Sequence, residues 1–144
     1  MYILDTNVVS ELRRPEKADT NVLQWASRVS VAQFYLSVIT IFEIERGIGL
    51  MARRDAEQAH VLRQWFGGHI LTAFANRILA IDAAVAMRCA QLHVPDPQSE
   101  RDSFIAATAL VHGMSVVTRN VKDFEKTGVP LINPWDAEEK TPHV

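Results

Sequence analysis

Short apolar runs alternate with longer amphipathic segments along the whole chain. The short runs are rich in β-branched and aromatic residues, which is typical of buried strands. They predict strands over residues 2–4, 34–37, 78–81, 116–118 and 131–133. The longer segments repeat apolar residues every three to four positions, which is the period of a helix. They predict helices over residues 6–13, 40–51, 54–66, 83–92 and 100–112, and another that starts after the cap Asp19 and runs through Trp25 and Val29.

Prolines and glycines mark where these segments end. Pro15 follows the first predicted helix, Gly67-Gly68 is expected to end the helix over 54–66, and Gly113 closes the helix over 100–112. Residues 94–98 contain two prolines and are predicted to form a loop. No internal repeat or long linker divides the chain, so the pattern predicts one domain.

Strands that alternate with helices indicate right-handed βαβ crossovers and therefore an α/β fold with a parallel sheet. In such sheets, ligands bind beyond the carboxyl ends of the strands. Polar residues at that edge are therefore the first candidates for a functional site.

The composition is that of an ordinary globular protein, with 48% hydrophobic and 22% charged residues. A net charge of −2 neither favours nor excludes a nucleic-acid partner. The single cysteine, Cys89, excludes an internal disulfide and a cysteine metal cluster. No apolar run is long enough for a membrane span and no signal peptide precedes the first strand, so no membrane contact and a cytoplasmic location are expected.

Two acidic residues follow the first two predicted strands. Asp5 comes directly after residues 2–4, where it is either a helix cap or a functional group, and the two roles are compatible. Glu43 has the spacing of a capping box with Thr40, which is the alternative to a functional role. Gly47 lies one turn further on the same helix face. A glycine inside a helix is unfavourable unless that face packs closely on a neighbour, so the face of Glu43 is expected to look inward.

Two further acids lie near the last strands. Asp102 shares a helix face with apolar residues that are expected to be buried, so its carboxylate is expected to be partly desolvated. Those residues are Ile105, Ala106, Ala109 and Leu110. A favourable position in the helix dipole is the alternative for Asp102. Asp123 lies beyond the strand over 116–118, and its alternative is a loop acid that caps a turn.

All four acids are predicted to fall on one edge of the sheet. Carboxylates at about 4 Å from one another repel by several kcal/mol at an effective dielectric constant of about 20, and a hard divalent cation removes this repulsion. Oxygen ligands without a histidine or cysteine cluster favour Mg²⁺ or Mn²⁺ over Zn²⁺. Such ions typically serve phosphate chemistry.

The chain resembles the PIN-domain nucleases, and most closely the VapC/FitB-like toxins of type II toxin–antitoxin pairs. The matching stretches are YILDTN (2–7), SVITIFE (37–43) with Gly47, DSFIAATA (102–109) and TRNVKDF (118–124). They occur in the order of the family and cover nearly the whole chain. The polar segment over residues 93–101 departs from the compact loop that the family often has before its third acid.

The resemblance implies a three-layer α/β/α sandwich over residues 1–135, followed by a polar tail over 136–144. It implies that Asp5, Glu43, Asp102 and Asp123 form the acidic metal-binding and catalytic set. It further implies an RNA substrate, often transfer or ribosomal RNA, a homodimer, and a cognate antitoxin with a DNA-binding domain.

Water activated by Mg²⁺ is expected to attack an RNA phosphodiester and to leave 5′-phosphate and 3′-hydroxyl ends. Thr118 and Asn120 are supporting candidates that could orient a water or a carboxylate; a strand residue and a turn residue are the alternatives. Two other functions stay open. One is a PIN-like module that binds RNA or protein without catalysis. The other is an aspartyl-phosphate phosphatase that uses Asp5, which would want a second acid where Asn7 stands.

Overall fold

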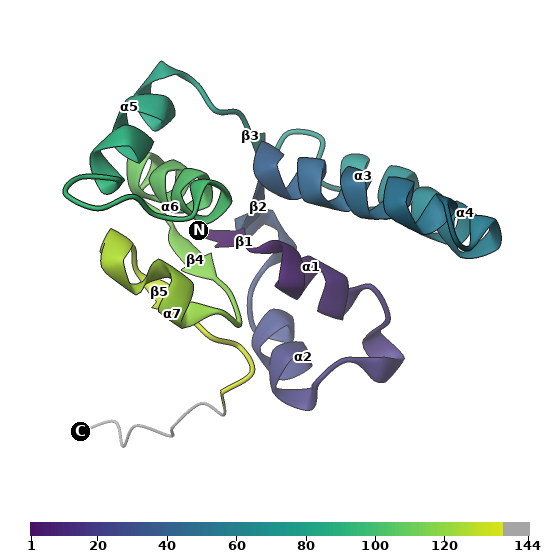
Figure 1. The fold of residues 1–144 in the computed structure, drawn as a ribbon. Coiled ribbons are helices and arrows are strands. Elements are labelled where there is room, and N and C mark those ends of the chain that lie inside the picture. The colour runs from purple at the N-terminus through teal and green to yellow at the C-terminus, as the bar shows by residue number, and fades with distance from the viewer. Residues whose placement is uncertain (137–144) are drawn as a thin grey trace, which may run out of the picture.

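Five parallel strands form the central sheet of the computed structural model, which describes residues 1–136 (Figure 1). The strands are β1 (Tyr2–Leu4), β2 (Phe34–Ser37), β3 (Ile78–Leu79), β4 (Ser115–Val117) and β5 (Leu131–Ile132). Their order across the sheet is β3-β2-β1-β4-β5, and every neighbouring pair is parallel. The predicted parallel α/β sheet is therefore confirmed; the bounds of β1 and β2 agree with the prediction, and those of β3, β4 and β5 differ from it by one or two residues.

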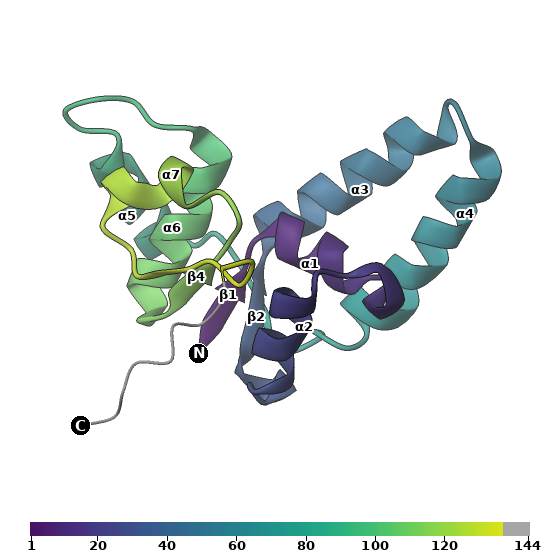
Figure 2. The same ribbon diagram turned by 90° about the horizontal axis from the view of Figure 1, so that it is seen from below.

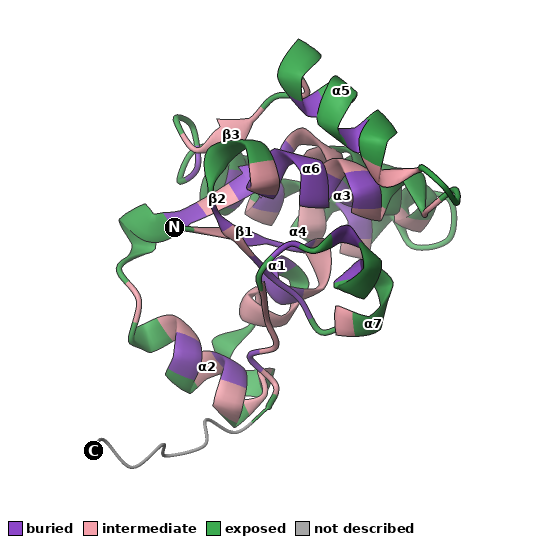
Figure 3. Ribbon diagram, turned by 90° about the vertical axis from the view of Figure 1, so that its left-hand side faces the viewer, coloured by how far each residue is buried: buried purple, intermediate pink, exposed green. Residues whose placement is uncertain are grey.

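Helices cover both faces of the sheet and give three α/β/α layers (Figures 1 and 3). One face carries α1, α2, α3 and α4, and the other carries α5, α6 and α7. Their bounds are α1 Thr6–Leu12, α2 Thr20–Ser27, α3 Val38–Ala52, α4 Ala56–Trp65, α5 Ala83–Leu92, α6 Glu100–His112 and α7 Val121–Phe124. Short 3₁₀ turns occupy Pro15–Lys17, Val31–Gln33 and Glu125–Thr127.

The alternation of strand side chains divides the core between the two faces. Leu4 and Val117 pack into the cluster beneath α1 to α4, whereas Ile3 and Val116 pack beneath α6 and α7. Consecutive residues of a strand point to opposite faces, so two apolar residues in succession serve both layers. Helix α6 buries Ile105, Ala106 and Ala109 of the predicted stripe completely, whereas Leu110 is only partly buried, and Cys89 is buried beside this helix.

The predicted helix end at Gly67-Gly68 is wrong. The chain continues beyond α4 as a π-helical segment over Phe66–Leu71. Phe66 and Ile70 are buried in the core from this segment, and the Thr72 hydroxyl donates to the Gly67 carbonyl oxygen at 2.8 Å. Burial of these apolar side chains outweighs the helix-ending tendency of the two glycines.

Two other local expectations are also wrong. Gly47 is exposed, and a Cβ built there meets no atom within 4 Å, so no close packing explains this glycine. Helix α3 starts at Val38, with the Ser37 hydroxyl as its cap, and Thr40 is a buried residue inside the helix. Asp123, for which a loop acid was the alternative interpretation, lies in the short helix α7.

Helices α3 and α4 form an antiparallel hairpin that extends away from the sheet (Figure 2). Within residues 1–136, no helix is both long and apolar enough to cross a membrane. The predicted polar tail over 136–144 lies outside the described residues, apart from Asp136.

Candidate active site

The candidate site lies where the strand order reverses, between β1 and β4. Chain connections leave these two strands in opposite directions across the sheet, which opens a crevice at their carboxyl ends. Asp5 follows β1 directly, and Thr118 follows β4 directly. The Thr118 hydroxyl donates to Asp5 Oδ2 at 2.8 Å and joins the two strand ends.

Asp5 is the most enclosed of the four candidate acids, with 6% of its surface exposed. The backbone N–H of Thr6 donates to Oδ1 at 2.8 Å, so Asp5 caps α1. The Asn7 amide donates weakly to Oδ2 at 3.4 Å. Its cap role and its place in the crevice therefore coexist.

Burial raises the pKa of Asp5 to about 6. The hydrogen bonds from Thr118 and Thr6 oppose this rise because they stabilise the carboxylate. The negative charges of Asp102 and Glu43 add to the rise. Three acids from distant parts of the sequence therefore lie within electrostatic range of one another.

Glu43 is linked to Asp5 through Thr6, the first residue of α1. The Thr6 hydroxyl donates to Glu43 Oε1 at 3.0 Å and lies 3.2 Å from the Thr40 hydroxyl. The capping-box alternative for Glu43 is wrong, because Ser37 caps α3. The Arg101 guanidinium approaches the other Glu43 oxygen, with 3.5 Å between Nη1 and Oε2.

Asp102 lies in the first turn of α6 and is partly buried, as expected. Burial raises the pKa of Asp102, and the charges of Asp123 and Glu43 raise it further. A hydrogen bond with Ser99 and the charge of Arg101 lower the pKa of Asp102 and only partly offset this rise.

Asp123 and Asn120 lie at the outer rim of the crevice. Both are exposed, and Asp123 is close enough to act on the pKa of Asp102. Asn120 occupies the position before α7 without a capping hydrogen bond from its side chain, and its backbone N–H donates to the Thr118 hydroxyl at 3.0 Å. Thr118 thus contacts an acid directly, whereas the contact shown for Asn120 uses its backbone.

The donor set suits a hard divalent cation, because the acids supply only oxygen atoms and their negative charges raise the pKa of Asp5 and of Asp102. In the part of the chain that is described, no three acidic, histidine or cysteine side chains are grouped closely enough to hold one ion directly. The electrostatic effects place the four acids in one neighbourhood: Asp5, Glu43, Asp102 and Asp123. Direct ligation of one ion by three of these acids needs side-chain movement.

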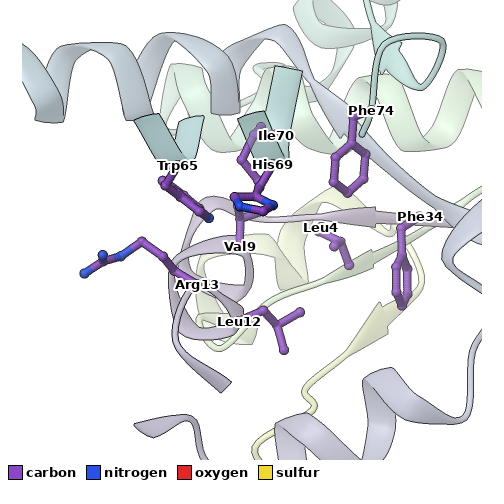
Figure 4. Close-up of a pocket in the computed structure, with 9 residues that line it drawn as sticks. All are labelled: Leu4, Val9, Leu12, Arg13, Phe34, Trp65, His69, Ile70 and Phe74. Atoms are coloured by element: carbon purple, nitrogen blue, oxygen red, sulfur yellow. The ribbon is translucent and has the colours of Figure 1, made fainter. Parts of the chain in front are cut away.

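Two cavities lie beside α1, and one of them reaches this neighbourhood. One of about 210 Å³ has Thr6 and Glu43 in its wall. A second, mostly apolar cavity of about 180 Å³ is bounded by α1, β2 and the segment after α4 (Figure 4). Arg13 and Trp65 line both cavities, with the guanidinium carbon 5.9 Å from the Trp65 ring. Figure 4 shows the guanidinium at the end of the second cavity opposite Phe34 and Phe74.

The fold and the acid-lined crevice define a class that sequence comparison identifies. The family described as "PIN domain" matches residues 2–130, and the chain belongs to this family. The VapC ribonuclease Y4jK of Sinorhizobium fredii is 36% identical over 94% of this chain and 99% of the relative. Toxin FitB of Neisseria gonorrhoeae is 35% identical over 94% of this chain and 99% of the relative. A solved structure of FitAB bound to the IR36 DNA fragment matches with a TM-score of 0.86 and 35% identity, covering 98% of this chain and 100% of the matched chain.

Sequence reasoning missed three polar residues in the crevice. In the sequence, Thr6 and Thr40 have ordinary explanations as helix or capping residues. Only the packing of α1 against α3 brings their hydroxyls together. Arg101 could have been noticed, because a basic residue in the first turn of a helix is disfavoured by the helix dipole and calls for a reason.

Proposed function

We propose that the chain is a Mg²⁺-dependent endoribonuclease and the toxin of a type II toxin–antitoxin pair. The observation that carries the proposal is the buried Asp5 carboxylate at the reversal of strand order, coupled electrostatically to Glu43 and Asp102. Similarity to a VapC ribonuclease and to toxin FitB over nearly the full length of each supports both parts. Mn²⁺ is the expected substitute for Mg²⁺.

Asp5, Glu43, Asp102 and Asp123 are the proposed metal ligands and catalytic residues. A bound Mg²⁺ would supply an activated water and offset negative charge on the scissile phosphate. Thr6 and Thr118 hold Glu43 and Asp5 in place through their hydroxyls. Attack by water would leave 5′-phosphate and 3′-hydroxyl ends on RNA, for which transfer or ribosomal RNA is the expected source.

The proposed partner is an antitoxin that carries a DNA-binding domain, and the proposed assembly includes a homodimer of this chain. The match to FitAB in a DNA-bound structure supports a partner of that kind. A PIN-like module that binds RNA or protein without cleavage is the alternative. An aspartyl-phosphate phosphatase is disfavoured, because Asn7 stands where it would need a second acid.

The test is cleavage of total cellular RNA and of a random-sequence single-stranded oligoribonucleotide pool, with and without Mg²⁺. Asp5→Asn is expected to reduce Mg²⁺-dependent cleavage at least about 100-fold, since loss of even indirect metal partners costs 10- to 100-fold. Asp55→Asn is the matched control, because Asp55 caps α4 at the far tip of the α3–α4 hairpin.

Two results would contradict the proposal. One is undiminished cleavage by folded Asp5→Asn protein. The other is RNA binding without cleavage by the wild type, which would support the non-catalytic alternative. Labelling of Asp5 as a stable acyl phosphate would instead support the phosphatase.

A further inference from the structure

Phe42 is an exposed aromatic side chain next to a proposed catalytic acid. Its exposed fraction is 53%, while every other phenylalanine, tryptophan and tyrosine in residues 1–136 is buried or partly buried. An exposed phenylalanine ring forgoes about 1.5–3 kcal/mol of burial free energy. A single exposed apolar residue is common on protein surfaces, so its surroundings decide whether it has a role.

Those surroundings join the ring to a cation and to the acid cluster. Phe42 directly precedes Glu43 on α3, and Arg101 comes from α6, which contacts α3. The Arg101 guanidinium carbon lies 5.5 Å from the Phe42 ring centroid, and Nη1 lies 3.5 Å from Glu43 Oε2. The guanidinium therefore lies over the aromatic ring at the rim of the crevice.

The Arg101 guanidinium keeps donors free for a further ligand. Its side chain is 46% exposed, and it makes no hydrogen bond to another side chain or backbone group within the described range. Its ion pair with Glu43 is long and uses one nitrogen. A guanidinium has five N–H donors in a planar fork that suits phosphate, so several remain available.

We propose that Phe42 and Arg101 form a nucleotide-binding subsite for single-stranded RNA. Phe42 stacks on one unpaired base, and Arg101 binds the phosphate beside it. The inference rests on the proposed function and adds how the substrate is held. A phosphate that approaches the acids is repelled by them, and Arg101 offsets this repulsion at their rim. Bases within a duplex are stacked on both faces, so the ring selects an unpaired base.

The experiment compares steady-state cleavage of the random-sequence oligoribonucleotide pool by four variants in Mg²⁺. Phe42→Leu keeps an apolar side chain and removes the aromatic face, and it is expected to raise the apparent KM about 5- to 100-fold with kcat nearly unchanged. Phe42→Trp should retain the wild-type KM, and Arg101→Gln should raise it. Leu50→Ala is the matched control, because Leu50 is a 55% exposed apolar residue later on α3.

A split between KM and kcat, rescued by Phe42→Trp, separates base stacking from a structural role. An unchanged KM in Phe42→Leu, while the wild type cleaves RNA, overturns the subsite and leaves the proposed function standing. If Phe42→Leu keeps its KM but changes the oligomeric state in light scattering, the ring belongs to an interface between protein chains, and the subsite is overturned. A wild type that cleaves no RNA overturns the proposed function and the subsite together.

Discussion

Asp5 serves the fold and the candidate site with the same carboxylate. One oxygen caps α1 through the Thr6 N–H, and the other accepts from Thr118 at the end of a strand far away in the sequence. Burial of this group makes its charge costly, and the neighbouring acids add to that cost. Within residues 1–136 no cation forms an ion pair with Asp5, and a buried carboxylate in that situation is unfavourable to the fold and suited to binding a cation.

The raised pKa of Asp5 predicts a pH-dependent effect of Asp5→Asn on stability. The folded-state pKa of about 6 exceeds the ordinary aspartate value of 3.8, so the folded protein binds the proton more tightly than the unfolded chain. This group therefore lowers the free energy of unfolding as pH rises from about 4 to about 6, and the loss is complete above that range. A shift of about two units corresponds to at most about 3 kcal/mol. Without metal, Asp5→Asn should be more stable than wild type at pH 8, by about 1–3 kcal/mol.

Urea unfolding at pH 4, 6 and 8 in the presence of a chelator measures this difference. The stabilisation should shrink steadily toward pH 4, where Asp5 is largely protonated in the folded protein. A difference between the two proteins that stays the same at all three pH values would show that Asp5 does not titrate in this range.

Helix α3 contributes residues to both the hydrophobic core and the candidate site. It presents Glu43 to the crevice, exposes Phe42 at the rim, and buries Ile44 and Ile48 in the core. Gly47 lies between these groups without steric need, because a Cβ there meets nothing within 4 Å. Its backbone also lies inside a helix, where glycine is unfavourable.

Gly47→Ala should therefore raise the free energy of unfolding by about 0.5–1 kcal/mol. Chemical denaturation of both proteins measures the change. Gly113→Ala is the contrasting variant and should be destabilising, because Gly113 ends α6 with a φ of +67°, a conformation that L-residues rarely adopt. A destabilised Gly47→Ala protein would indicate that α3 needs local flexibility or packs on another chain at this point.

The elements themselves were largely predictable, because each strand and long helix carries its own apolar period. The α5 and α6 bounds agree with the prediction, and Asp19 caps its helix as predicted. The start of α3 and the extension beyond α4 were not predictable in this way. There, burial of Thr40 and of Phe66 depends on neighbours that the local pattern does not contain.

The strand order brings together site residues that are distant along the chain. A crossover that leaves β3 at one edge places β4 beside β1, and this pairing sets Thr118 against Asp5. The sequence predicted that the acids fall on one edge and pointed to Thr118 as a group that could orient a carboxylate, but it held no information on the hydrogen bonds through Thr6 and Thr40. Those contacts depend on the packing of helices and strands that are distant along the chain.

The central claim is that this edge gathers carboxylates around one divalent cation. Anomalous diffraction from crystals grown with Mn²⁺ tests it most directly, because Mn²⁺ takes the same oxygen ligands as Mg²⁺ and can be located by its scattering. A Mn²⁺ peak bound by Asp5 and at least one of Glu43, Asp102 and Asp123 is the expected result. Mn²⁺ that binds elsewhere, while this crevice stays empty at a concentration that supports RNA cleavage, would contradict the account.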